Sequence, residues 1–122
     1  AYRNRGMLVE LGEGRFGLPG FVDIHVHAPQ WPQAALALDE PLYLWLEQRT
    51  FPLESKFSDM EFARRVYGDL VDALLARGST TTVYLGSAHL ESSIELAAIL
   101  RRKRGPARTC RQNGHGRPRR EP

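Results

Sequence analysis

The alternation of side chains between Phe21 and His27 constrains this chain more than any other feature of its sequence. It lies within the run PGFVDIHVHAPQ, residues 19–30. Side chains on a β-strand point to opposite faces in turn, so the alternation predicts a strand with one apolar and one polar face. The apolar face carries Val22, Ile24 and Val26, and the polar face carries Asp23, His25 and His27. We therefore expect two imidazole rings on the same side of one strand.

Two histidines at this spacing are typical of a metal site. Residues two apart on a strand are separated by roughly 6.5 Å, and ring nitrogens can converge from there on one ion at about 2.0–2.1 Å each. The alternative is a hydrogen-bonded core role, but two neutral imidazoles side by side would need two separate partners. We predict that His25 and His27 are metal ligands. Asp23 either orients them as a hydrogen-bond acceptor or belongs to a structural polar network.

A long amphipathic helix is predicted over residues 59–77, and a β-branched strand over residues 79–85. A strand, a long helix and a strand in this order predict two parallel strands joined by a right-handed crossover. The ends of the helix carry a capping box, a hydrophobic staple and a C-terminal glycine, which are Ser58 with Glu61, Phe57 with Phe62, and Gly78.

The loop after the second strand contains His89, on the same carboxyl edge as the histidine pair. Because His89 has no partner at ligand spacing, we expect it to shape the loop or to support a ligand by a hydrogen bond, in preference to binding metal. A further helix is expected from Ser92, with Glu95 completing a capping box, to about Lys103.

Shorter elements are expected elsewhere. Residues 41–49 predict a short helix capped by Asp39, with Pro52 ending the run. Residues 7–11 predict a short strand followed by a glycine turn.

Charge is distributed unevenly along the 122 residues. From Arg101 onward nine Lys or Arg face one acidic residue, a net charge of +8, so with a total of +3 the remainder carries −5. A basic arm for nucleic acid is one interpretation of this end, but it has no aromatic residues to stack on bases. The lone Cys110 has no partner for an internal disulfide. No apolar run reaches the length of a membrane span and no signal peptide opens the chain, so we expect a cytoplasmic protein without membrane contact.

The run PGFVDIHVHAPQ resembles the first barrel strand of the amidohydrolase superfamily. Further runs are similar to its metal-dependent guanine deaminases, over roughly residues 17–102. These matches are Gln30, DEPLYLWL at 39–46, TFPLE at 50–54 and GSTTT at 78–82.

This resemblance implies an α/β fold that is an incomplete (β/α)8 TIM-type barrel, because a whole barrel needs about 250 residues. Residues 1–18 would be a remnant of a small flanking β-sandwich, residues 19–104 a partial barrel, and residues 105–122 a disordered, Arg-rich tail. We hypothesise that this tail comes from a shifted reading frame, a retained intron or a mispredicted exon.

The resemblance also implies a function. Members convert guanine and water to xanthine and ammonia with one zinc ion, so His25 and His27 would bind zinc, Gln30 would recognise the purine and Trp31 would stack on it or cover the loop. The remaining ligands and the proton-transferring glutamate come from later strands in the family. We therefore expect no catalytic residue within this chain, no activity of the chain alone, and a homodimer for a full-length member. A truncated isoform that interferes with that dimer is the alternative.

Overall fold

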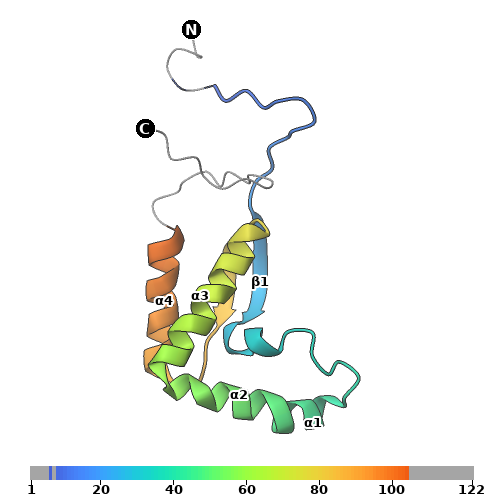
Figure 1. The fold of residues 1–122 in the computed structure, drawn as a ribbon, viewed down its shortest axis with the longest axis vertical. Coiled ribbons are helices and arrows are strands. Elements are labelled where there is room, and N and C mark those ends of the chain that lie inside the picture. Colours follow the sequence, from blue (N-terminus) through green and yellow to red (C-terminus); the bar gives the residue numbers. More distant parts are fainter. Residues whose placement is uncertain (1–5, 7, 105–122) are drawn as a thin grey trace.

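The computed structural model describes Gly6 and residues 8–104, which form a mixed α/β unit around a two-stranded sheet (Figure 1). Residues 105–122, with the predicted tail, lie outside the described part. The elements in chain order are β1 (Phe21–His27), η2 (Ala28–Gln33), α1 (Leu42–Trp45), η3 (Leu46–Thr50), α2 (Phe51–Ser55), η4 (Lys56–Ser58), α3 (Met60–Ala76), β2 (Ser79–Leu85) and α4 (Leu90–Arg104).

Strands β1 and β2 pair in parallel, as the order of strand, helix and strand predicted. Phe21 lies opposite Ser79 and His27 opposite Leu85, with irregularities in the register between them. Gly20 lies where the strands begin, and a Cβ built there would come within 1.9 Å of the Thr80 side chain, so the close approach of the chains requires glycine. The parallel pairing places the carboxyl ends of both strands at one edge.

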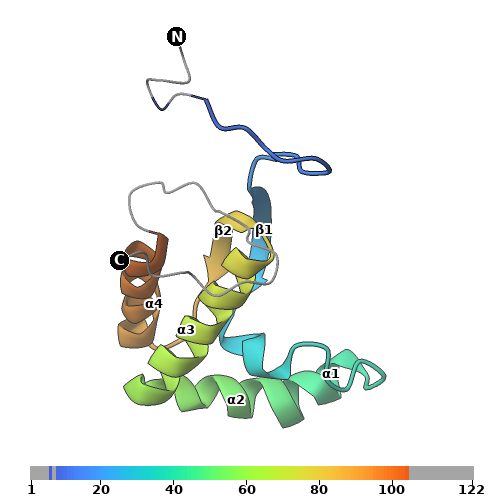
Figure 2. The same cartoon turned by 45° about the horizontal axis from the view of Figure 1, so that its top comes forward.

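Helix α3 packs against β2, and α4 lies beside α3 in both ribbon views (Figures 1 and 2). The core forms where α3, α4, η2 and η4 meet, around the fully buried Phe57 and Tyr67, whose rings are 5.0 Å apart. The other buried apolar residues are Ala28, Ala63, Val66, Leu70, Val71, Leu96 and Ile99. The apolar stripe predicted for the long helix is therefore confirmed as core packing.

The predicted capping box of α3 is wrong by one residue. Asp59, and not Ser58, is the N-cap, because its carboxylate accepts from the backbone N–H groups of Glu61 at 2.8 Å and Phe62 at 3.3 Å. The Ser58 hydroxyl instead donates to the preceding helical turn. The staple contact still forms, since Phe57 and Phe62 meet edge to face at 5.2 Å. Gly78 follows the helix with φ +87°, as expected of a C-terminal glycine.

Two other helix boundaries also differ from prediction. Asp39 does not cap α1, whose N-cap is Pro41 without a side-chain hydrogen bond. Pro52 does not end the helix either, because α1, η3 and α2 run on from Leu42 to Ser55. The π-helical turn η3 ends at Thr50, two residues before Pro52, and such a turn shifts the backbone hydrogen bonds near the point where proline supplies no N–H.

The capping box predicted at Ser92 is also wrong, because α4 begins at Leu90. Ser92 is buried in the first turn, and its hydroxyl donates to the His89 carbonyl at 3.0 Å and contacts the Ser87 hydroxyl. Ser92 does not act as the N-cap, because its hydroxyl forms hydrogen bonds with the loop before the helix. The far end of α4 is tied to α3, since Lys103 donates to the Gly68 carbonyl at 2.9 Å and pairs with Asp72.

The N-terminal segment extends away from this unit as an open loop (Figure 2). Residues 8–11 form no strand, contrary to the prediction for 7–11, and the chain turns where Arg15 N–H donates to the Gly12 carbonyl at 3.1 Å. A strand needs a neighbouring strand, and the described sheet consists of β1 and β2. The division into residues 1–18, 19–104 and 105–122 remains a prediction.

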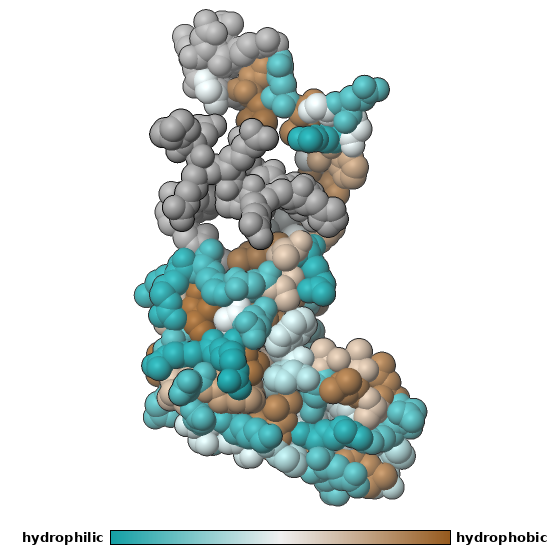
Figure 3. Space-filling model, in the orientation of Figure 1, coloured by the Kyte–Doolittle hydropathy of each residue, from teal (hydrophilic) through white to brown (hydrophobic). Residues whose placement is uncertain are grey.

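Large apolar side chains remain at the surface, so parts of the sheet and of the helical run are not covered. Ile24 on β1 is 74% exposed and Leu38 before α1 is 78% exposed. Figure 3 shows hydrophobic patches among the hydrophilic surface, including at the lower right near α1 and the loop before it. Among the described residues, no helix has both the length and the apolar character needed to cross a membrane.

Candidate functional site

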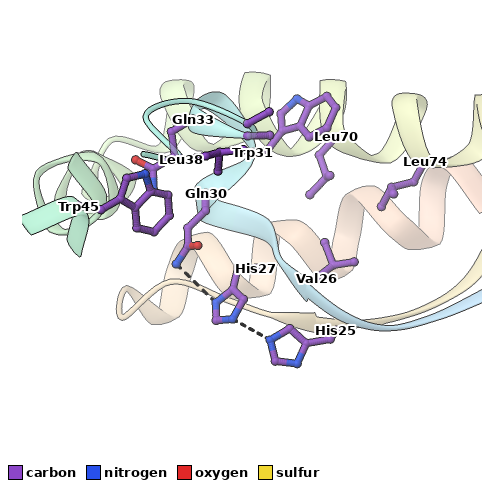
Figure 4. Close-up of a pocket in the computed structure, with 12 residues that line it drawn as sticks. His25, Val26, His27, Gln30, Trp31, Gln33, Leu38, Trp45, Leu70 and Leu74 are labelled. Atoms are coloured by element: carbon purple, nitrogen blue, oxygen red, sulfur yellow. Dashed lines mark hydrogen bonds between the residues drawn. The ribbon is translucent and has the colours of Figure 1, made fainter. Parts of the chain in front are cut away.

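The histidine pair lies at the carboxyl end of β1 with its rings turned toward each other (Figure 4). The Nε2 atoms of His25 and His27 are 3.0 Å apart, the ring centroids are 4.9 Å apart and the planes are tilted by 53°. Both side chains are exposed. The alternation of β1 thus brings both imidazoles to one side, with their outer nitrogens directed at the same point.

Gln30 continues this polar row from the turn η2. Its amide Nε2 lies 3.5 Å from Nδ1 of His27 and donates to Oε1 of Glu54 at 3.0 Å. The strand ends directly before Ala28 and Pro29, so the chain turns back and places Gln30 beside the ring of His27. Two histidines and an amide therefore form one continuous polar edge.

A hollow of about 400 Å³ lies beside this edge, with both tryptophans of the chain in its wall. Its wall is otherwise mostly apolar, as in many sites that bind small molecules. Trp31, which the resemblance implied would stack on the purine or cover the loop, is half-buried and also packs against the core. The lining residues are His25, Val26, His27, Gln30, Trp31, Gln33, Ala34, Ala35, Leu38, Trp45, Leu70 and Leu74.

The loop over the hollow, residues 34–41, is held by a few polar contacts. Trp45 Nε1 donates to the Leu36 carbonyl at 3.0 Å, and Arg49 forms an ion pair with Glu40. The Arg49 guanidinium holds the pKa of the Glu40 carboxyl below its ordinary value. Ala35 and Ala37 have φ of 62° and 53°, a region that favours glycine, so the glycine-poor sequence of this loop is accommodated with backbone strain.

Asp23 and His89 lie differently from the histidine pair. The Asp23 carboxylate accepts from the backbone N–H of His25 at 3.1 Å, so it fixes the strand and not an imidazole ring. His89 does not line the hollow; its backbone N–H donates to Ser87 Oγ at 3.2 Å and its carbonyl accepts from the Ser92 hydroxyl. Its observed contacts are those of a loop residue, and supporting roles of either side chain toward a ligand remain predictions.

Glu54 is the site residue that the sequence reasoning missed. It is half-buried on α2 and reaches back to Gln30 across 24 positions of sequence. Near it, Gln33 donates to Thr50 at 2.7 Å in a second buried link between η2 and the helical run. Both Thr50 and Glu54 belong to the run TFPLE, which the sequence analysis singled out without assigning a role to its glutamate.

The donor set at this edge fits part of a zinc site. Two nitrogens that each lie about 2.0–2.1 Å from one ion in near-tetrahedral geometry are roughly 3.3 Å apart, close to the observed 3.0 Å. Imidazole is a preferred ligand of zinc. No cluster of three or more His, Cys, Asp or Glu side chains that could hold a metal occurs in residues 8–104. The described part therefore offers two ligands of the three or more that a catalytic zinc needs.

Comparison with known proteins gives a consistent result, although no family model matches the chain. A guanine deaminase of Dictyostelium discoideum is 49% identical over 98 residues, which are 80% of this chain and 21% of the relative. A probable guanine deaminase of Schizosaccharomyces pombe is 45% identical over 85 residues, 70% of this chain and 16% of the relative. The chain thus spans about a fifth of the length of its curated relatives.

Comparison of the fold with solved structures also finds guanine deaminases. The crystal structure of guanine deaminase from C. acetobutylicum with bound guanine in the active site superposes with a TM-score of 0.67 and 36% identity, over 69% of this chain and 20% of that chain. The resemblance inferred from PGFVDIHVHAPQ and the later runs is therefore confirmed. In sequence and in fold, the matched segment is similar to guanine deaminases over about a fifth of their length.

Proposed function

We propose that this chain supplies part of the active site of a hydrolase that converts guanine and water to xanthine and ammonia. The observation that carries the proposal is the convergence of the His25 and His27 nitrogens beside Gln30, at the mouth of an apolar hollow. The names of the relatives add support, since they are guanine deaminases and one solved structure holds guanine.

Zinc is the metal that we propose for this edge, with His25 and His27 as two of its ligands. When bound, zinc would lower the pKa of a coordinated water and so supply a nucleophile at neutral pH. Gln30 would hold the purine through its amide, and Trp31 would cover the ring from the wall of the hollow. Asp23 would keep the strand that carries both ligands in place.

Proton transfer and the completion of the metal site need groups beyond the described residues. Two imidazoles do not fix a catalytic zinc, so we propose that this chain does not turn over guanine by itself. In a whole member of the family, the β1–α3–β2–α4 unit would open a (β/α)8 barrel, and further strands would cover its exposed apolar faces. A homodimeric, cytoplasmic protein is part of the same proposal.

Tryptophan fluorescence can test the purine site, because both tryptophans, Trp31 and Trp45, line the hollow. Guanine titrated into the full chain with zinc present should quench the emission, and Trp31→Phe should remove most of that response. Adenine serves as the control ligand and should bind at least tenfold more weakly, a difference of about 1.4 kcal/mol. Equal responses to both purines, or none to guanine, would contradict the proposed site.

Ammonia release tests the second part of the proposal. With guanine and zinc, the chain alone should release no more ammonia than a His25→Ala/His27→Ala variant. Zinc-dependent release well above that variant would show that the missing ligands are present after all.

A further inference from the structure

We propose that Glu54 is a positioning residue that fixes the orientation of the Gln30 amide, so that the carbonyl oxygen of Gln30, and not its nitrogen, is the atom offered to the ligand. The inference rests on the proposed function in that Gln30 is taken to contact the purine. Beyond that function, Glu54 would determine which atom of Gln30 contacts the purine, and therefore which groups a ligand must present.

The contacts of Gln30 determine which way its amide lies. Nε2 donates to Glu54 Oε1 at 3.0 Å and lies 3.5 Å from His27 Nδ1. A carboxylate can only accept hydrogen bonds, so the NH₂ group, and not the oxygen, must face Glu54. Figure 4 shows the same nitrogen turned to the ring of His27. Among the described residues, Oε1 of Gln30 makes no hydrogen bond, which leaves it free to accept one from a ligand.

Glu54 is held firmly enough to impose this orientation. It lies on α2 within the continuous helical run from Leu42 to Ser55 and is half-buried. One helical turn earlier, the buried Thr50 accepts from Gln33 at 2.7 Å. The turn η2 and the helical run are thus joined by two parallel links, from Gln33 to Thr50 and from Gln30 to Glu54. The Gln33–Thr50 bond thus holds the two elements together close to the contact between Gln30 and Glu54.

An accepting oxygen at this position selects ligands that present N–H groups. Guanine carries a ring N–H and an adjacent exocyclic amino group on one edge, and either can donate to Oε1 of Gln30. A ring with only acceptors on that edge would leave the oxygen unpaired, and a site that loses such a bond discriminates strongly. Glu54 would therefore take part in substrate choice without touching the substrate.

Guanine binding to the full chain tests this inference, with matched variants and a double exchange. Glu54→Gln keeps the volume but lets the Gln30 amide adopt either orientation, so the dissociation constant should rise about tenfold, which corresponds to 1.4 kcal/mol. Glu47→Gln makes the same change at an exposed position of the preceding helical turn and should leave binding within about twofold, as expected of a surface substitution.

Exchanging the side chains at positions 30 and 54 distinguishes a positioning role of Glu54 from a general structural role. Gln30→Glu alone places two carboxylates together and should abolish binding, whereas Gln30→Glu/Glu54→Gln restores a donor opposite an acceptor and should recover affinity to within about threefold. In ¹⁵N–¹H spectra, the side-chain NH₂ signal of Gln30 should move in Glu54→Gln and not in Glu47→Gln, while backbone signals stay in place to confirm the fold.

The outcomes separate the two proposals. If guanine binds the unmodified chain, but Glu54→Gln binds it equally well or the double exchange fails to recover binding, the role of Glu54 is refuted and the proposed function stands. If guanine neither binds the unmodified chain nor moves the NH₂ signal of Gln30, the proposed function is refuted and this inference falls with it.

Discussion

Nε2 of His25 and Nε2 of His27 lie 3.0 Å apart, on side chains two residues apart in one strand. Without a metal, the N–H of one ring must donate a hydrogen bond to the bare nitrogen of the other. With a metal, both nitrogens would donate an electron pair to the same ion, and neither would carry a proton. The observed spacing therefore suits either a hydrogen bond between the rings or a metal ion that both rings share.

Metal binding should depend on both rings of the pair. Titration of zinc into the full chain should shift the ring signals of His25 and His27 in histidine NMR spectra. His25→Ala or His27→Ala should each weaken binding at least tenfold, about 1.4 kcal/mol, because a single imidazole replaces a chelating pair. Glu91→Gln, at an exposed position at the start of α4, is the control and should leave the titration unchanged. Undiminished zinc binding by the His25→Ala/His27→Ala double variant would show that another site takes the metal.

The sequence predicted the elements whose pattern is local. The alternation from Val22 to His27 placed β1, and the helical period placed α3 with its buried stripe and Gly78 at its end. Residue spacing also predicted that the two imidazoles share a side, because strand geometry alone determines that relationship.

Boundaries and long-range contacts were not predictable in the same way. Asp59 and Ser58 are both good N-caps, and only the path of the chain from η4 selects between them. The helical run continues past Pro52 because a π-turn precedes the proline. The presence of proline in the sequence does not predict such a turn. The contact of Gln30 with Glu54 joins two elements across a loop, so neither the period nor the spacing of the sequence contains it.

The loop over the hollow should gain stability from a glycine at position 35. Ala35 has φ of 62°, a conformation that costs an L-residue roughly 1–2 kcal/mol, while the extra freedom of glycine in the unfolded chain costs about 0.4–1 kcal/mol. Ala35→Gly should therefore raise the free energy of unfolding by about 0.5–1 kcal/mol in urea titrations. The neighbouring Ala34 has φ of −54°, so Ala34→Gly should lower it by a similar amount. If both variants lose stability, the left-handed conformation at Ala35 is contradicted.

Removing one buried hydroxyl should stabilise the core. Tyr67 of α3 is fully buried against Phe57, and within the described residues its hydroxyl has no hydrogen-bond partner. A buried polar group without a partner costs about 1–3 kcal/mol, so Tyr67→Phe should raise the free energy of unfolding by about 1 kcal/mol. Tyr43→Phe, at a side chain that is 64% exposed, should change it by less than about 0.5 kcal/mol. A clear loss of stability in Tyr67→Phe would mean that the hydroxyl does find a partner.

The ion pair that joins α4 to α3 should make stability depend on pH in a defined direction. Glu95 accepts from Arg102 at 2.9 Å and pairs with Arg64 of α3 at 3.5 Å. The Arg102 hydrogen bond, reinforced by the charge of Arg64, lowers the pKa of Glu95 below its ordinary value of 4.5. Because the unfolded chain then takes up this proton before the folded chain does, the contribution of Glu95 is complete above pH 4.5 and is lost as the pH falls through the lowered pKa.

Glu95→Gln removes this contribution at every pH. Urea titrations should therefore show the unmodified chain more stable than the variant at pH 7, with a difference that stays constant down to about pH 4.5 and then shrinks toward zero. Glu13→Gln, at an exposed turn of the N-terminal segment, controls for the loss of one negative charge and should show no such convergence. An undiminished difference for Glu95→Gln at pH 3 would contradict the prediction, because a protonated carboxyl and an amide carry the same charge and have nearly the same size.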